Sequence, residues 1–305
     1  MAFRVVFIEN EVGVRMKLDN LVLETYEGEV WIPISDISTV VLDNLKITLT
    51  TRLLSMLATN NVTLIVCNEK HLPIGLYCSY DNHSRVFKHI GYQINTSKEK
   101  YNEIWKNIVI RKILNQADVI EKLGKNNEIS RDIRKMASET KDGDITNREA
   151  HAAKIYFNEL MDSSFSRGNE EILLNSGLDY GYTIIRSYIA RVCVGYGLNS
   201  QLGIHHKNEY NRFNLIDDLM EPIRPMLDCF TYYLLDGEEY FTLNHRKELI
   251  NFLNHKVIYN NKKMYISNMI EEYIQQYAAV IAGKKEQFEI PRFEGYEGEF
   301  LYVGV

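Results

Sequence analysis

"ISTVVLDNLKITLTTRLLSMLATNNVTLIVC", residues 37–67, is the stretch that decides the fold. Its first part, "ISTVVLDN", is short, rich in Val and Leu, and ends in polar turn residues, which predicts a strand. The period then changes: Leu49, Leu53 and Leu57 recur at helical spacing in "TLTTRLLSMLATNN", and the Asn-Asn pair ends the helix. "VTLIVC" returns to a strand. We therefore expect one helix between two strands.

The segments on both sides extend this β-rich pattern. "FRVVFIEN", "VGVRMKLD" and "NLVLETYEGEVWIPI" precede it and "PIGLY" follows it, all of them short and rich in apolar residues. "YEGE" supplies a hairpin turn inside the third segment. Residues 1–78 are therefore predicted to form a compact β-rich domain with one helix.

The pattern becomes helical after about residue 85. "KEKYNEIWKNIVIRKILNQADVIEKL" places its isoleucines near one helical face and its charges elsewhere. No strand pattern recurs, and further helices are expected at about 146–161, 179–197, 214–234, 245–254 and 262–282. We therefore predict an α+β chain in two domains, with a polar linker over 79–96 and an all-α catalytic domain over 97–305.

Composition limits the class of protein. The chain has 305 residues, of which 45% are hydrophobic, and no apolar run approaches the about 18 residues of a membrane span. The four cysteines fit no common zinc or redox spacing. Reduced thiols and a poor signal peptide indicate a cytoplasmic protein without membrane contact. The net charge is −6, but residues 85–154 carry 15 Lys and Arg against 10 Asp and Glu, so nucleic-acid binding is not excluded.

Three carboxylates lie close together in "GIHHKNEYNRFNLIDDLMEPIRP", residues 203–225. On a helix, Asp217, Asp218 and Glu221 fall at spacings that bring them to one face. The ordinary interpretation is a solvated face with Arg224 as counter-charge. Pro222 disfavours a continuous helix, so Glu221 is expected at a kink or in the first turn of a new helix.

Two histidines, His205 and His206, precede this helix in a loop without apolar periodicity. One imidazole combined with carboxylates favours Mn²⁺, with Mg²⁺ as the alternative. Taken alone, a surface pair of histidines is the ordinary interpretation.

Two further segments carry candidate residues. "NREAHAAKIYFNEL", residues 147–160, has Glu149 in the first turn of a predicted helix that is capped near Thr146 or Asn147, where an acid favours the helix dipole in any case. "NSGLDYGYTIIRSYIARVCVGYGLNSQLG", residues 175–203, is no phosphate-binding loop, because no Gly-Lys-Ser/Thr follows. It predicts a buried central helix whose glycines allow close helix contact.

These segments, in this order, resemble one family, the CRISPR-associated integrases that insert new spacers into the array during adaptation. The segment "WIPISDISTVVLDNLKITLTTRLLSMLATNNVTLIVCNEKHLPIGLY" is similar to the N-terminal domain of that family. "NREAHAAKIYF" resembles its E-x-x-A-A-x-x-Y-F helix, and "NSGLDYGYTIIRS" its N-x-x-L-x-Y-G-Y segment. "GLNSQLGIHH" followed by "LIDDLMEPIRP" resembles its G-L-x-x-x-L-G-x-x-H … D-L-x-E-x-x-R-P core. The resemblance covers essentially the whole chain and is strongest to the type II-A branch.

The resemblance implies a set of metal ligands. Glu149 and Glu221 match the two acidic ligands of the family. Asp218 matches an aspartate that supports the ligands without binding the metal itself. Counting from the family glycine selects His206 as the imidazole ligand. A slip of one residue in the loop would select His205, which follows an apolar residue as the family histidine does. Both histidines therefore stay open.

The resemblance further implies an activity, a cofactor and partners. The family uses Mg²⁺ or Mn²⁺ and joins the 3′-hydroxyl ends of a double-stranded protospacer to the leader-proximal repeat by transesterification. It works as a homodimer, which we assign to residues 1–78, and two dimers flank a dimer of a small ferredoxin-fold partner. Two alternatives share the residues: a structure-selective DNA nuclease without integration, and a non-catalytic DNA-binding scaffold subunit.

Basic residues are expected to contact the DNA backbone. Those near the predicted metal site are Lys207, Arg212 and Arg224. Those of the basic helical stretch are Arg111, Lys112, Arg131, Arg134, Lys135 and Arg148.

Overall fold

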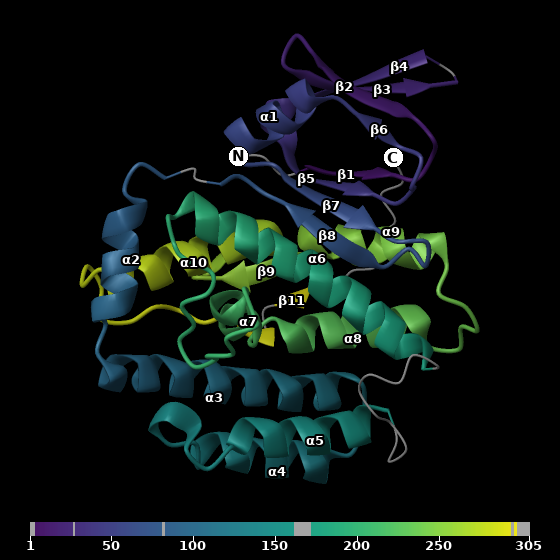
Figure 1. Cartoon of the computed structure of the whole chain (residues 1–305). Coiled ribbons are helices and arrows are strands. Elements are labelled where there is room, and N and C mark those ends of the chain that lie inside the picture. The colour runs from purple at the N-terminus through teal and green to yellow at the C-terminus, as the bar shows by residue number, and fades with distance from the viewer. Residues whose placement is uncertain (1–3, 27, 81–82, 162–171, 294–295, 298–305) are drawn as a thin grey trace.

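The computed structural model of the chain describes residues 4–26, 28–80, 83–161, 172–293 and 296–297. Strands β1 (Arg4–Ile8), β5 (Ile37–Leu42), β7 (Thr63–Cys67) and β8 (Pro73–Tyr77) form one four-stranded sheet. Strands β4 (Gly28–Pro33), β3 (Asn20–Thr25), β2 (Gly13–Lys17) and β6 (Thr48–Leu49) form a second. Helix α1 (Thr51–Thr59) lies beside them (Figure 1). The predicted β-rich region with one helix is confirmed.

The first sheet is buried on both faces along β5, where two cores meet across it. Its strands β1, β5 and β7 pair in parallel, and all six residues of β5 are buried. Val40 and Leu64 face the core of the N-terminal region, together with Leu53 and Leu57 of α1. Val41 and Ile65, one position further along their strands, pack into the core of the helical region. Alternation along the strands thus joins the two regions of the chain.

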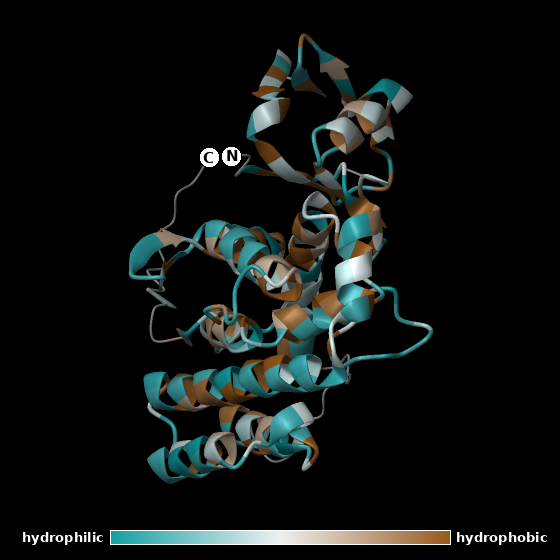
Figure 2. Ribbon diagram, turned by 90° about the vertical axis from the view of Figure 1, so that its left-hand side faces the viewer, coloured by the Kyte–Doolittle hydropathy of each residue, from teal (hydrophilic) through white to brown (hydrophobic). Residues whose placement is uncertain are grey.

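The remainder of the chain is largely helical (Figure 1). Its helices are α2 (Val86–Asn95), α3 (Lys98–Lys122), α4 (Asn127–Ser138), α5 (Arg148–Leu160), α6 (Leu173–Gly195), α7 (Asn214–Met220), α8 (Arg224–Leu235), α9 (Leu243–Asn251) and α10 (Ile266–Ile281). The helical ribbons carry hydrophobic and hydrophilic residues side by side (Figure 2), as helices with one buried face do. No described helix is both long and apolar enough to cross a membrane.

Helix α6 is buried along most of its length. At Gly177 and Gly181, a side-chain carbon would come within 2.5 Å of Leu235 and 2.7 Å of Leu227. The predicted role of these glycines, close contact with a neighbouring helix, is therefore confirmed.

The prediction that no strands recur after residue 85 is wrong. Strands β9 (Lys256–Tyr259) and β10 (Lys262–Tyr265) form a hairpin, and β11 (Tyr296–Glu297) pairs with β9. The hairpin turn consists of Asn260 and Asn261 with φ of 50° and 60°, a conformation that Asn tolerates better than other non-glycine residues. Residues 262–265 are thus a strand and not the first turn of α10. The C-terminal region is largely helical and not all-α.

Other helix limits also differ from the predictions. The segment 79–96, predicted as a linker, contains α2, and α6 begins at Leu173 and not near residue 179. The predicted helix over 214–234 is two helices, α7 and α8, separated at residues 221–223. The break agrees with the kink expected at Pro222, and it places Glu221 at the end of α7.

Candidate metal and nucleic-acid site

The loop before α7 is folded around the carboxylate of Asp218, whose side chain is fully buried. One oxygen, Oδ2, accepts the backbone N–H of Ile204 at 2.6 Å and that of His205 at 2.9 Å, while Oδ1 lies 2.6 Å from His206 Nδ1. Gly203 makes the tight turn possible, because a side-chain carbon there would lie 2.2 Å from the carbonyl oxygen of His206. Asp218 therefore fixes the position of both histidines.

The two histidine rings differ in their surroundings. His205 stacks on Trp105 of α3, with ring centroids 4.5 Å apart and planes 3° from parallel. The ring of His206 stands edge-on to the same tryptophan at 5.7 Å. Its hydrogen bond to Asp218 raises the pKa of His206, whereas burial lowers the pKa of His205. Because Nδ1 of His206 is engaged by Asp218, Nε2 is the nitrogen that this ring can offer to a ligand.

Glu149 lies in the first turn of α5, as predicted, but the cap of this helix differs from the prediction. Asn147 occupies the N-cap position with φ of 52° and makes no capping hydrogen bond through its side chain. Instead, the Asp144 carboxylate accepts the backbone N–H of Arg148 at 2.9 Å and that of Glu149 at 3.0 Å. The carboxylate of Asp144 satisfies two N–H groups that have no partner within the helix.

Glu221 is held at the break between α7 and α8. Its side chain is only 7% exposed, and its Oε1 accepts a hydrogen bond from Arg224 Nε at 3.0 Å. The break itself is tied to α3, because Asn115 Nδ2 donates to the carbonyl oxygen of Pro222 at 2.7 Å. The direction of the Glu221 carboxylate is thus determined by contacts on two neighbouring helices.

The two glutamates meet at Lys112, a buried residue of α3. Its ammonium is in ion-pair contact with the carboxylates of both Glu149 and Glu221. Three segments that are far apart in the sequence, in α3, α5 and α7, therefore converge at one point. The prediction that Lys112 contributes to the DNA-facing surface is wrong, because its side chain is 8% exposed and turned toward the carboxylates.

The electrostatics of this cluster favour the charged forms of Glu221 and Lys112. Burial alone would raise the pKa of Glu221, but the charges of Arg224 and Lys112 outweigh it and hold the pKa at about 2. Burial likewise acts to lower the pKa of Lys112, and the carboxylates of Glu221 and Glu149 more than compensate and raise it. Glu221 is therefore a carboxylate and Lys112 an ammonium at neutral pH.

The donor set fits a hard divalent cation. Two carboxylates from separate helices already share one positive charge, and an imidazole held by a carboxylate lies beside them. Within the described parts of the chain, no three His, Cys, Asp or Glu side chains stand close enough to form a metal site as they are placed. The Lys112 ammonium lies between the two carboxylates and contacts both.

Asp217 does not join this cluster. Its carboxylate pairs with Arg186 of α6 at 2.8 Å and accepts a hydrogen bond from Asn211 at 2.8 Å. The three neighbouring acids of residues 217–221 therefore have three different partners: an arginine for Asp217, the histidine loop for Asp218, and the Lys112–Arg224 pair for Glu221.

The predicted DNA-contacting residues fall into two groups. Lys207, Arg212, Arg131 and Lys135 are exposed. Arg224 stacks over the Tyr182 ring at 4.5 Å and pairs with Glu221, Arg148 pairs with Glu139 at 2.8 Å, and Arg134 pairs with Asp118 at 2.6 Å. Because Arg224, Arg148 and Arg134 are paired with acids, their first role is to hold the helices together.

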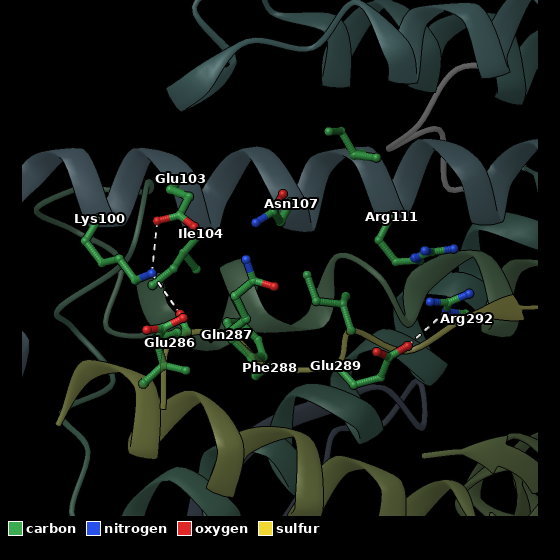
Figure 3. Close-up of a pocket in the computed structure, with 13 residues that line it drawn as sticks. Lys100, Glu103, Ile104, Asn107, Arg111, Glu286, Gln287, Phe288, Glu289 and Arg292 are labelled. Atoms are coloured by element: carbon green, nitrogen blue, oxygen red, sulfur yellow. Dashed lines mark hydrogen bonds and ion pairs between the residues drawn. The ribbon is translucent and has the colours of Figure 1, made fainter. Parts of the chain in front are cut away.

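Arg111 belongs to a groove between α3 and residues 286–292, with a volume of about 260 Å³ (Figure 3). Lys100 closes one end by contacts with Glu103 and the carbonyl oxygen of Glu286, both at 2.9 Å. A second cavity, of about 430 Å³, lies along the histidine loop and includes Gly203, Lys207 and Asn214. The second cavity adjoins the site and the predicted phosphate contact Lys207.

Sequence reasoning missed Lys112, Trp105 and Asp144 as parts of the site. Lys112 follows three buried apolar positions of α3 at helical spacing, which are Ile104, Ile108 and Val109. A lysine on an apolar helical face requires a buried acidic partner. The sequence therefore indicated that Lys112 has a buried acidic partner, but nothing in the local pattern indicated which acids Lys112 would contact.

Comparison with known proteins identifies the family and agrees with the fold. Residues 5–242 match the model of the family described as CRISPR associated protein Cas1, so the chain belongs to the Cas1 family of CRISPR-associated endonucleases. It is 31% identical over 295 residues to a CRISPR-associated endonuclease Cas1 of Neisseria meningitidis serogroup C (strain 8013), with 95% of this chain and 96% of the relative covered. The predicted family is confirmed. The resemblance to its type II-A branch stays a prediction.

Two solved structures share the fold. A casposase bound to integration product superposes with a TM-score of 0.80 at 18% identity, over 98% of this chain and 96% of the other. A chain of a Cas6-RT-Cas1–Cas2 complex superposes with a TM-score of 0.73 at 16% identity, over 94% of this chain and 36% of the other. At these identities the likeness is one of fold.

Proposed function

We propose that this protein is a metal-dependent DNA integrase of CRISPR adaptation, which joins protospacer 3′-hydroxyl ends to the leader-proximal repeat. The observation that carries the proposal is the convergence of Glu149 and Glu221 on one cation, beside a histidine pair held by Asp218. The membership of the Cas1 family supports it, as does the fold shared with a casposase bound to integration product.

The residues of the chain have distinct tasks in this proposal. Glu149, Glu221 and Nε2 of His206 hold Mg²⁺ or Mn²⁺, with His205 as the alternative imidazole. Asp218 holds the ring of His206 in one orientation through Nδ1. When bound, the divalent ion stabilises the charge that develops on the phosphoryl group and lowers the pKa of the attacking hydroxyl.

Strand transfer conserves the number of phosphodiester bonds. The 3′-hydroxyl oxygen of the protospacer forms a bond to the phosphorus at the leader–repeat boundary while the bond from that phosphorus to the 3′-oxygen of the flanking leader nucleotide breaks. The attacking hydroxyl loses a proton and the released 3′-oxygen gains one, so no nucleotide cofactor is required. Lys207 and Arg212, which are exposed and adjoin the histidines in sequence, would contact phosphates in this proposal. Arg131 and Lys135 of α4 add positive charge further along the molecule.

The assembly is also part of the proposal. We assign homodimer formation to the β-rich residues 1–78, and catalysis to residues 97–305. We further propose that two such dimers bind a dimer of a small ferredoxin-fold partner. A chain of a Cas6-RT-Cas1–Cas2 complex shares this fold, which supports a partner of the Cas2 kind.

A strand-transfer assay tests the function. Labelled protospacer duplex and a supercoiled leader–repeat plasmid are incubated with this protein and its small partner in Mn²⁺, Mg²⁺ or EDTA. We expect covalent transfer of label in either metal and none in EDTA. Glu149→Gln and Glu221→Gln should each lower transfer roughly 10³-fold, because several kcal/mol of transition-state stabilisation are lost. Both should retain DNA binding.

Asp132→Asn, which changes an exposed acid of α4, is the matched control and should transfer as the wild type does. Nicking without transfer of label would favour a structure-selective nuclease instead. Unaltered DNA with intact binding, in metal and in EDTA alike, would favour a scaffold subunit. If the two glutamine variants stay folded but lose DNA binding and transfer to the same degree, the assignment of these residues as metal ligands is contradicted.

A further inference from the structure

Lys112 is the one member of the cluster whose position the proposed chemistry does not explain. It lies in the interior of α3, between Val109 and Ile113, both fully buried, and its side chain is 8% exposed. A buried lysine is rare without a partner, and this one has two, Glu149 and Glu221. These are the carboxylates assigned above to the metal.

The two cations beside Glu221 are held in different ways. Arg224 is fixed by its hydrogen bond to Glu221 Oε1 and by the Tyr182 ring, whose hydroxyl in turn donates to Asp228. A guanidinium with a fixed stacking partner moves only with its surroundings. The Lys112 ammonium sits at the end of a flexible four-carbon stem, and within the described parts of the chain its ion-pair partners are the two glutamates.

A divalent ion and the ammonium require the same place. Both are attracted to the position between the Glu149 and Glu221 oxygens, and two positive charges in contact there would repel each other strongly in a buried site. The ion carries twice the charge of the ammonium and can neutralise both carboxylates. Oxygen Oε2 of Glu221, which contacts the Lys112 ammonium, is one of the oxygens for which the two cations would compete.

We propose that Lys112 is a built-in counter-ion that occupies the metal position in the metal-free protein and withdraws when the divalent ion binds. This inference rests on the proposed function, because it takes Glu149 and Glu221 as metal ligands. Lys112 then has two opposite effects: it stabilises the empty site, in which two carboxylates would otherwise face each other, and it weakens metal affinity by competing for the same oxygens.

Variants of Lys112 test the inference by calorimetric titration of the apo-protein with Mn²⁺ and by melting in EDTA. Lys112→Met removes the charge and keeps most of the volume. We expect it to bind Mn²⁺ at least about tenfold more tightly than the wild type, equivalent to about 1.4 kcal/mol, and to melt at a lower temperature in EDTA. Lys112→Gln, which also lacks the charge but can donate hydrogen bonds, should show the same tightening with a smaller loss of stability.

The matched control is the substitution Lys106→Met. Lys106 is a lysine of the same helix that is 36% exposed and pairs with Asp142 at 2.9 Å. The substitution should leave Mn²⁺ affinity unchanged. Equal or weaker Mn²⁺ binding by both neutral Lys112 variants would overturn the inference.

The withdrawal of the Lys112 side chain can also be measured in the wild-type protein. Reductive methylation followed by peptide mass analysis should show Lys112 protected in EDTA and labelled several-fold faster in Mn²⁺, with Lys106 labelled equally in both. Protection that does not change with Mn²⁺ would contradict withdrawal of the side chain.

Titration of Glu221→Gln separates this inference from the proposed function. If the wild type binds Mn²⁺ and Glu221→Gln does not, the metal site stands, and the Lys112 variants alone decide the inference. If neither the wild type nor the neutral Lys112 variants bind Mn²⁺, the proposed function fails, and the inference fails with it.

Discussion

Two clusters of buried charge in this molecule look alike and differ in one respect. In the first, the fully buried Asp43 at the end of β5 pairs with Arg246 of α9 at 3.0 Å and with Nδ1 of His71 at 3.0 Å. In the second, Lys112 joins Glu149 and Glu221. Both connect segments that are distant in the sequence. In the first, one carboxylate has several donors, whereas in the second two carboxylates share one mobile ammonium.

The difference shows which buried charges indicate a binding site. The Asp43 carboxylate is surrounded by donors on both oxygens and has no need of a further cation. It ties the N-terminal region to the helical region, next to the pair between Lys247 and Glu9 at 3.2 Å. In the second cluster, two carboxylates share Lys112 as the donor that contacts both of them. Glu149 is 28% exposed, so a ligand can reach this position from solvent. One cation shared by two carboxylates, one of which is partly exposed, distinguishes the proposed metal site from the Asp43 cluster.

Asp43→Asn is expected to have the largest effect on stability. It leaves the Arg246 guanidinium, 8% exposed, without its counter-charge, which typically costs about 3–5 kcal/mol. Urea unfolding followed by circular dichroism would measure the loss. Mn²⁺ affinity and strand transfer per folded molecule should stay at the wild-type level, because the cluster is separate from the site.

Glu11→Gln is the control for this prediction, since Glu11 pairs with Lys46 on the surface with side chains 61% and 74% exposed. Pairs of this kind contribute about 0–1 kcal/mol. A loss of Mn²⁺ affinity in folded Asp43→Asn would show that the two clusters are coupled, and the comparison between them would then break down.

The two histidines give a smaller and more selective effect. His206→Ala should weaken Mn²⁺ binding roughly 10- to 100-fold, since it removes the ring that Asp218 orients. His205→Ala removes the ring stacked on Trp105 and should change Mn²⁺ affinity much less. Calorimetric titration of both variants would decide between them. The reverse order of effects would make His205 the ligand and would show that the loop rearranges when metal binds.

Much of this architecture could be predicted from local pattern. Period-two and helical spacing located the β-rich region, α1, α3 and α5, because burial of one face imposes that period on the residues themselves. The β9–β10 hairpin was missed although "KVIYNNKKMY" alternates around an Asn-Asn turn, because the segment adjoins a long apolar helix whose period dominates. The break at Glu221 was predicted, since proline excludes a backbone hydrogen bond in any context.

The site was only partly accessible to such reasoning. The family motifs selected Glu149, Asp218 and Glu221. The partner of each side chain depends on how the helices cross, and the spacing of residues along the chain carries no information about that crossing. Lys112 is the clearest case. Counted as a positive charge in a basic stretch, it was assigned to DNA, whereas its place on the buried side of α3 turns it toward two acids. A lysine's function follows from the face of the helix that carries it.

Substitution of the exposed basic residues of α4 is expected to have the smallest effect on stability. These residues contrast with both buried clusters, because their charges lie on the surface. Arg131 and Lys135 lie on the solvent side of the helix, where charges need no partner to remain ionised. Arg131→Ala and Lys135→Ala should each change folding stability by no more than about 0.5 kcal/mol. Each should reduce the slope of log DNA affinity against log salt concentration by about 1, if the residue neutralises one phosphate. Fluorescence anisotropy of a labelled duplex across salt concentrations would measure the slope. An unchanged slope in both variants would move the DNA path away from α4, toward the exposed Lys207 and Arg212 beside the histidines.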